Sequence, residues 1–266
     1  MTKRDKSVGE FFNKISGQYD AKYDSKSNKF LAHFFRRRLE IATDGLPKSL
    51  GTVMDIGAGT GQLYRFLLEN GYSFDDYIAV DLSEGMLSKS PIPQKSKHVG
   101  TVHLPTIDRY IGKVDHFFLL GVTTYMKSDE LVDALERIER LSKLDGLLIC
   151  TFTNRNSIEF MLQSMISSIL KITKRFSRNR SNLVASQTFS RLIIGEAKMK
   201  SFLTSHGTIE RIDYINQTFT PVNRLLTVTS IRLEYALSRL FRKRPRALAL
   251  LSSDILFRLR LKRFKS

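Results

Sequence analysis

Residues 53–61 read Val-Met-Asp-Ile-Gly-Ala-Gly-Thr-Gly, a short and mostly apolar run that breaks into closely spaced glycines. Leu63, Phe66 and Leu67 then share one helical face, so the stretch predicts a strand, a tight turn and the start of a helix. Glycine lets the backbone pass close under a ligand, and a helix start offers free N–H groups. The spacing is GxGxG, whereas the dinucleotide fingerprint GxGxxG would need a glycine where Gln62 stands.

Two carboxylates accompany this turn. Asp55 lies two residues before the first glycine, where it would repel a diphosphate but attract an ammonium group. Asp81 ends the next apolar run, residues 77–81, and a carboxylate at the end of a second strand can accept hydrogen bonds from both ribose hydroxyls of a nucleoside. The pair therefore favours S-adenosylmethionine over NAD as the ligand.

In these features the chain resembles the class I S-adenosylmethionine-dependent methyltransferases, and most of all the small-molecule branch that includes the quinone-biosynthesis C-methyltransferases. Its opening residues 10–20 are similar to the segment with which those enzymes begin. The likeness covers residues 8–153 well and residues 195–216 loosely. It implies an α/β protein with a Rossmann-like class I methyltransferase sheet, an N-terminal helical lid and a C-terminal helical addition.

The resemblance also implies a set of cofactor-binding residues. Asp55 would hold the aminoacyl end of the cofactor, Asp81 the ribose, and Gly121 would border the methyl group. Thr101 stands where family members usually carry an acidic residue beside the adenine amine. The full expected set is Asp55, Gly57, Ala58, Gly59, Asp81, Leu82, Met86, Thr101, Leu120 and Gly121.

The excess of basic side chains is concentrated in the C-terminal part of the sequence. The formal net charge is +17, and residues 151–266 hold 22 basic and 6 acidic side chains, a net +16. No run approaches the ~18 apolar residues of a membrane span, and no apolar signal core follows the N-terminus, so a cytoplasmic protein is expected.

The expected segments are a lid (1–50), a cofactor-binding α/β core (51–153), a helical insertion (154–194), the end of the core fold (195–238) and a basic amphipathic tail (239–266).

The residues after the fourth expected strand bear on the acceptor. Residues 120–125 contain neither the Asp/Asn-Pro-Pro-aromatic motif of base-amine methyltransferases nor a Pro-Cys pair, and no carboxylate cluster that could hold a metal is evident. This favours metal-independent transfer to a small molecule or to a lipid- or glycan-linked acceptor. No general base is identified; His33, Tyr19 and Tyr125 are the candidate catalytic residues at the acceptor pocket, and each could instead have a structural role.

Two alternatives stay open. The basic charge is typical of proteins that neutralise phosphates, which would fit an RNA methyltransferase, although base-targeting motifs are missing. The chain would also fit a catalytically inactive subunit that binds S-adenosylmethionine and regulates a partner.

The basic C-terminal third contains two segments in which apolar and basic residues alternate, within 158–180 and 248–263. Such segments predict contact with an anionic membrane surface, at the inner face of the membrane. The alternative is that the apolar stripes pack on the protein while the charges face water.

Overall fold

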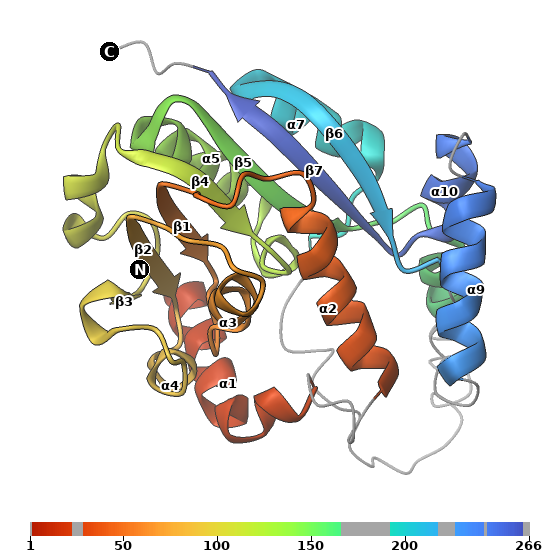
Figure 1. The fold of residues 1–266 in the computed structure, drawn as a ribbon, viewed down its shortest axis with the longest axis horizontal. Helices are drawn as coiled ribbons and strands as arrows, with labels where there is room; N and C mark the ends of the chain where they lie inside the picture. The colour runs from red at the N-terminus through yellow and green to blue at the C-terminus, as the bar shows by residue number, and fades with distance from the viewer. Residues whose placement is uncertain (1, 23–28, 166–191, 218–226, 242–243, 263–266) are drawn as a thin grey trace.

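The computed structural model describes residues 2–22, 29–165, 192–217, 227–241 and 244–262. Within these residues, seven strands form one sheet in the order β3-β2-β1-β4-β5-β7-β6 (Figure 1). The strands are β1 (Thr52–Ile56), β2 (Asp76–Asp81), β3 (Lys97–Val99), β4 (Val114–Leu119), β5 (Ser142–Thr153), β6 (Gly207–Ile215) and β7 (Asp254–Leu261). The first five pair in parallel, and β7 runs antiparallel to both β5 and β6. The expected α/β class and Rossmann-like sheet are confirmed.

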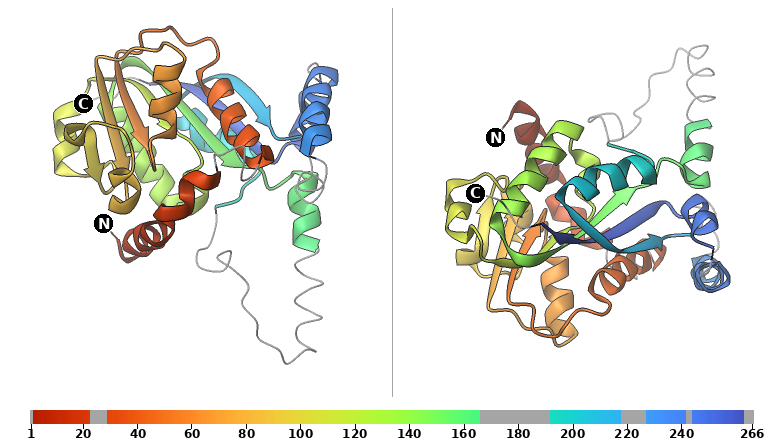
Figure 2. Two further views of the ribbon diagram at one scale, coloured as in Figure 1. Left: turned by 60° about the horizontal axis from the view of Figure 1, so that its bottom comes forward. Right: turned by 90° about the horizontal axis from the view of Figure 1, so that it is seen from above.

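Helices cover both faces of the sheet because successive strand residues point to opposite sides. The helices α5 and α7 lie on one face of the sheet, and α2 and α3 lie on the other (Figure 2). Phe117 joins the core cluster with α5 and α7, whereas the next residue, Phe118, joins the cluster with α2 and α3. The helices are α1 (Lys3–Tyr19), α2 (Lys29–Thr43), α3 (Gln62–Glu69), α4 (Glu84–Ser88), α5 (Ser128–Leu141), α7 (Glu196–His206), α9 (Thr227–Leu240) and α10 (Pro245–Leu251).

The N-terminal helix α1 belongs to neither layer. It lies across the ends toward which the arrows of β1 and β2 point (Figure 1), and it packs on the short helix α4 that follows β2. In open parallel sheets, ligands bind beyond these carboxyl ends of the strands. The placement of α1 at this edge agrees with the expected lid.

The interpretation of residues 239–266 as an amphipathic tail is wrong for its second half. Residues 254–261 form β7, which inserts between β5 and β6, and Leu256 and Leu259 are fully buried. Arg258 is buried and donates to the Asp44 carbonyl at 2.7 Å, whereas Arg260, whose side chain is 41% exposed, pairs with Glu210 at 2.8 Å. In the described part of the chain, no helix has the length and hydrophobicity to cross a bilayer.

Candidate cofactor and acceptor site

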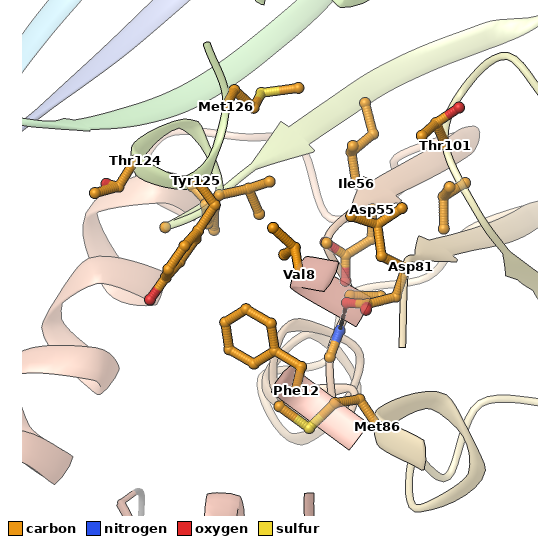
Figure 3. Close-up of a pocket in the computed structure, with 18 of the residues that line it drawn as sticks. Val8, Phe12, Asp55, Ile56, Asp81, Met86, Thr101, Thr124, Tyr125 and Met126 are labelled. Atoms are coloured by element: carbon orange, nitrogen blue, oxygen red, sulfur yellow. Dashed lines mark hydrogen bonds between the residues drawn. The ribbon is translucent and has the colours of Figure 1, made fainter. Parts of the chain in front are cut away.

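A cavity of about 750 Å³ lies between α1 and the carboxyl ends of the parallel strands (Figure 3). Its size is within the range of small-molecule sites. All ten residues expected to bind the cofactor line it: Asp55, Gly57, Ala58, Gly59, Asp81, Leu82, Met86, Thr101, Leu120 and Gly121. The sequence motif is thus brought together with the ends of β2 and β4 around one space.

The glycine turn between β1 and α3 has a backbone that favours glycine. Gly57 and Gly59 have φ angles of +79° and +55°, in the left-handed region. A Cβ on Gly57 would collide with Val122, whereas a Cβ on Gly59 would meet no protein atom nearer than 4.0 Å. Gly59 therefore borders open space in the cavity, as a backbone that must pass close under a ligand should.

Asp81 joins the glycine turn to the residues that follow β2. Its Oδ2 accepts a hydrogen bond from the Gly59 N–H at 2.8 Å, and its Oδ1 accepts one from the Ser83 N–H at 2.8 Å (Figure 3). Burial raises the pKa of Asp81, and these two hydrogen bonds oppose the shift. A carboxylate has about four acceptor positions, so two are left for hydroxyls of a ligand in the cavity.

Asp55 lies beside Asp81 on the cavity wall but has a different partner. Its Oδ2 accepts a hydrogen bond from the Tyr77 hydroxyl at 2.7 Å. The side chain is almost fully buried, and this burial raises its pKa to about 7. A carboxyl group in this state ionises readily when a cation approaches, which suits an ammonium group.

The raised pKa of Asp55 gives a prediction on stability. Because the pKa rises from 3.8 to about 7 on folding, the folded state binds more protons between these values, and stability falls as the pH rises through 7. Asp55→Asn, which keeps an acceptor for Tyr77, should gain stability relative to the wild type between pH 5 and pH 8, by at least about 1.4 kcal/mol. Urea unfolding at both pH values measures this gain. Asp75→Asn on the exposed surface is the control; an equal gain in that variant would contradict the assignment.

Hydrogen bonds anchor helix α1 on both sides of the cavity. Near its start, Arg4 donates to the Tyr125 carbonyl at 2.9 Å. In its middle, the Asn13 side-chain oxygen accepts from the Ser83 hydroxyl at 2.6 Å and from the Gly85 N–H at 2.8 Å. These contacts hold α1 over the space between the β4 and β2 ends.

The residue after α1 contacts the glycine turn itself. Asp20 accepts hydrogen bonds from the Thr60 hydroxyl at 2.5 Å and from the Gln62 amide at 3.1 Å. Val8, Phe12 and Tyr19 of α1 line the cavity. The N-terminal segment therefore closes the cavity and is tied to the turn beneath it.

The far side of the cavity combines aromatic and polar side chains, and apart from Tyr125 its residues were not identified from the sequence. Phe12 packs edge-on against Tyr125, with ring centroids 5.1 Å apart. Other residues that line this part are Phe34, Phe35 and Arg38 of α2, Thr124, Met126, Thr151, Thr153 and Asp254. No motif in the sequence marks these residues, because they come from elements far apart in the chain.

The three candidates for the acceptor pocket have different outcomes. Tyr19 and Tyr125 line the cavity, but His33 does not. The His33 Nε2 lies 2.8 Å from the buried carboxylate of Glu234 on α9. His33 therefore joins α2 to α9, and its candidacy as an acceptor-site residue was wrong.

Comparison with known proteins agrees with this geometry. Residues 54–148, from β1 into β5, match the protein family described as "Methyltransferase domain". An uncharacterized protein of Methanocaldococcus jannaschii is 24% identical over 189 residues, which are 71% of this chain and 66%, just under two thirds, of the relative.

Solved structures share the fold over nearly the whole chain. Geranyl diphosphate C-methyltransferase of Streptomyces coelicolor, in complex with Mg2+, geranyl diphosphate and S-adenosyl-L-homocysteine, superposes with a TM-score of 0.60 at 14% identity, covering 98% of this chain and 99% of that one. Magnesium protoporphyrin IX methyltransferase of Synechocystis gives 0.58 at 14% identity, with 97% and 100% covered.

The Haloferax volcanii chain in complex with the Trm112 methyltransferase activator also gives a TM-score of 0.58, at 17% identity, with 94% of this chain and 97% of that one covered. Residues 54–148 thus match a methyltransferase domain, and the chain has the fold of the class I S-adenosylmethionine-dependent methyltransferases.

Proposed function

We propose that the cavity binds S-adenosylmethionine and that the protein transfers the methyl group to a small molecule or to a lipid- or glycan-linked acceptor, without a metal ion. The observation that carries the proposal is the meeting of the buried carboxyl group of Asp55 and the half-buried one of Asp81 with the glycine turn at one cavity. The open space over Gly59 and the free acceptor positions of Asp81 fit an adenosine, and the ionisable Asp55 fits an ammonium group.

The cofactor would supply a methyl group on a positively charged sulfur. The acceptor nucleophile would bond to the methyl carbon in line as the carbon–sulfur bond breaks, and S-adenosyl-L-homocysteine would leave. The protein then has three tasks. Asp81 and the glycine turn fix the nucleoside, helix α1 excludes water, and the aromatic far side with Phe12 and Tyr125 orients the acceptor. Alignment of this kind can supply much of the rate enhancement without a dedicated base.

The direct test is transfer of labelled methyl groups. The protein is incubated with methyl-labelled S-adenosylmethionine and a fractionated cell extract, and label is counted in small molecules, lipid, glycan, protein and RNA. We expect label in one of the first three classes and none from the Asp81→Ala variant. Label in RNA would favour a nucleic-acid methyltransferase, and cofactor binding without any transfer would favour an inactive regulatory subunit.

The lid gives a separate prediction. Bound cofactor should slow amide hydrogen exchange in α1, because α1 and Asp20 close over the glycine turn. Asp20→Ala removes the acceptor shared by Thr60 and Gln62, and should weaken S-adenosyl-L-homocysteine binding about threefold to tenfold. Glu10→Ala, on the exposed side of the same helix, is the matched control. Exchange that is equal with and without ligand would show that α1 is a fixed part of the fold.

We also propose that an anionic membrane surface is a partner of the protein. Helical residues 158–165 carry an exposed apolar stripe, with Met161 55% and Met165 60% exposed, and the next residues, 166–191, hold six basic and no acidic side chains in sequence. An exposed apolar stripe beside basic residues is typical of interfacial helices. Residues 166–191 lie outside the described residues, so the observed apolar stripe ends at residue 165.

Vesicle co-sedimentation tests the membrane proposal. Binding should rise with the fraction of anionic lipid, fall with salt, and drop at least about fivefold in the Met161→Glu/Met165→Glu variant. Leu144→Glu, at a 67% exposed position at the other end of the sheet, is the control. Sedimentation that is independent of anionic lipid would mean that the stripe packs on protein instead.

A further inference from the structure

Arg38 is a charged side chain on the wall of the cavity that the proposed cofactor site does not use. It lies on α2, its side chain is only 12% exposed, and it borders the cavity together with Phe34 and Phe35. Its guanidinium stacks on both rings, with the carbon atom 4.7 Å from the Phe34 centroid and 5.3 Å from that of Phe35. The aromatic rings hold the flat group in place beside the open space.

The position of Arg38 is next to the end of β4. A Cβ built on Gly121 would lie 2.6 Å from Arg38 Nη1, so the guanidinium is packed directly against this glycine. Gly121 is one of the residues expected to border the methyl group. Arg38 is therefore on the acceptor side of the cavity, close to the proposed place of transfer.

The hydrogen-bonding capacity of Arg38 is largely unused. Among the described residues its one ionic partner is Asp254, the first residue of β7, with Nη2 and Oδ2 3.8 Å apart, too far for a hydrogen bond. The Nε atom is buried and has no hydrogen-bond partner in the described part of the chain. A guanidinium has five N–H donors and no acceptor, and buried donors without partners are costly.

Asp254 does not satisfy the unused N–H donors of Arg38. Its Oδ1 accepts a hydrogen bond from the Thr153 hydroxyl at 3.3 Å, and burial raises its pKa while Arg38 lowers it. The pair thus consists of a carboxylate with a hydrogen-bond donor of its own and a guanidinium that borders the cavity and forms no hydrogen bond to Asp254. Planar guanidinium groups bind carboxylates and phosphates through two parallel hydrogen bonds.

We infer that Arg38 is a specificity-determining residue that binds an anionic group, a carboxylate or a phosphate, on the methyl acceptor. The aromatic side chains of Phe12, Phe34 and Phe35 would contact an apolar or aromatic body attached to that group. This inference rests on the proposed function, because it assigns the far side of the cavity to the acceptor. It narrows the acceptor class to amphipathic anions.

The test uses pairs of probes that differ in charge but little in shape. Benzoate and benzamide, and separately phenyl phosphate and its neutral isostere phenyl phosphorodiamidate, are titrated into the complex with S-adenosyl-L-homocysteine. The wild type should bind the anion of at least one pair about tenfold more tightly than its neutral counterpart. The ratio of the affinity for the anion to that for its neutral counterpart is compared between the two pairs. The pair with the larger ratio shows whether Arg38 recognises a carboxylate or a phosphate.

Variants separate recognition from a structural ion pair. Arg38→Gln should abolish the preference for the anion, Arg38→Lys should keep part of it, and Asp254→Asn should keep or increase it because a competing carboxylate is removed. Arg36→Gln, a 68% exposed position on the same helix, is the control and should leave the preference unchanged. A structural ion pair would instead make Arg38→Gln and Asp254→Asn equally destabilising, with no change in preference.

Failure of this inference is distinguishable from failure of the proposed function. Binding of S-adenosyl-L-homocysteine is measured first in each variant and should stay within about threefold of the wild type. If the wild type binds that cofactor product but treats charged and neutral probes alike, or binds none of them, the inference is overturned and the cofactor site stands. If the wild type does not bind S-adenosyl-L-homocysteine, the proposed function itself is wrong.

Discussion

Replacing Asp81 with alanine should weaken S-adenosyl-L-homocysteine binding at least tenfold, and about a hundredfold if both ribose hydroxyls bind this carboxylate. Each hydrogen bond to a charged group contributes about 1.5–3 kcal/mol. The variant also frees the Gly59 N–H and the Ser83 N–H, both at 2.8 Å from the carboxylate, so the turn becomes less well ordered before ligand arrives.

Calorimetric titration measures this loss, and circular dichroism reports whether the fold is retained. Asp76→Ala is a suitable control because Asp76 begins the same strand at the opposite end from the cavity. An Asp81→Ala variant that binds with wild-type affinity would remove Asp81 from the proposed site.

Alanine at two glycines of the same turn should have different effects: mainly a loss of stability at Gly57 and mainly a loss of cofactor affinity at Gly59. Gly57→Ala should lower the free energy of unfolding by about 2–4 kcal/mol, because it combines a left-handed φ of +79° with a collision against Val122. Gly59→Ala should cost only about 1 kcal/mol, since its Cβ meets no protein atom nearer than 4.0 Å. Its methyl group would instead occupy cavity space, so its cofactor affinity should fall at least about tenfold.

Urea unfolding and calorimetry separate these two effects. The double variant Gly57→Ala/Val122→Ala should regain part of the stability lost in Gly57→Ala, because the collision is removed while the φ strain stays. Equal stability losses at Gly57 and Gly59, or no recovery in the double variant, would contradict the packing of Val122 under the turn.

The parts of the fold that follow from local pattern could be predicted from the sequence. The strand, glycine turn and helix around residues 53–67 depend on short-range periodicity and on glycine chemistry, and the structure confirms them. Strand β7 does not have such a signature. Arg258 and Arg260 interrupt its apolar residues, and only pairing with β5 and β6, distant in sequence, buries Arg258 and gives both arginines partners.

The site residues, too, could be predicted where they depend on local pattern, and they were missed where they depend on contacts between elements distant in sequence. The ten expected cofactor residues follow strand ends, where the parallel topology brings them together, and all of them line the cavity. Arg38 and Asp254 were missed because their proximity depends on the placement of α2 beside β7. His33 was misassigned for a related reason: neighbouring positions on a helix point about 100° apart, so Phe34 faces the cavity while His33 faces Glu234.

The central claim is that this cavity is an S-adenosylmethionine site held by Asp55, Asp81 and the glycine turn. A crystal structure of the protein grown with S-adenosyl-L-homocysteine tests it most directly. We expect the ribose hydroxyls within hydrogen-bond distance of Asp81, the amino group near Asp55, and the backbone of Gly59 against the ligand. Ligand bound elsewhere, or a cavity that stays empty at saturating concentration, would contradict the claim.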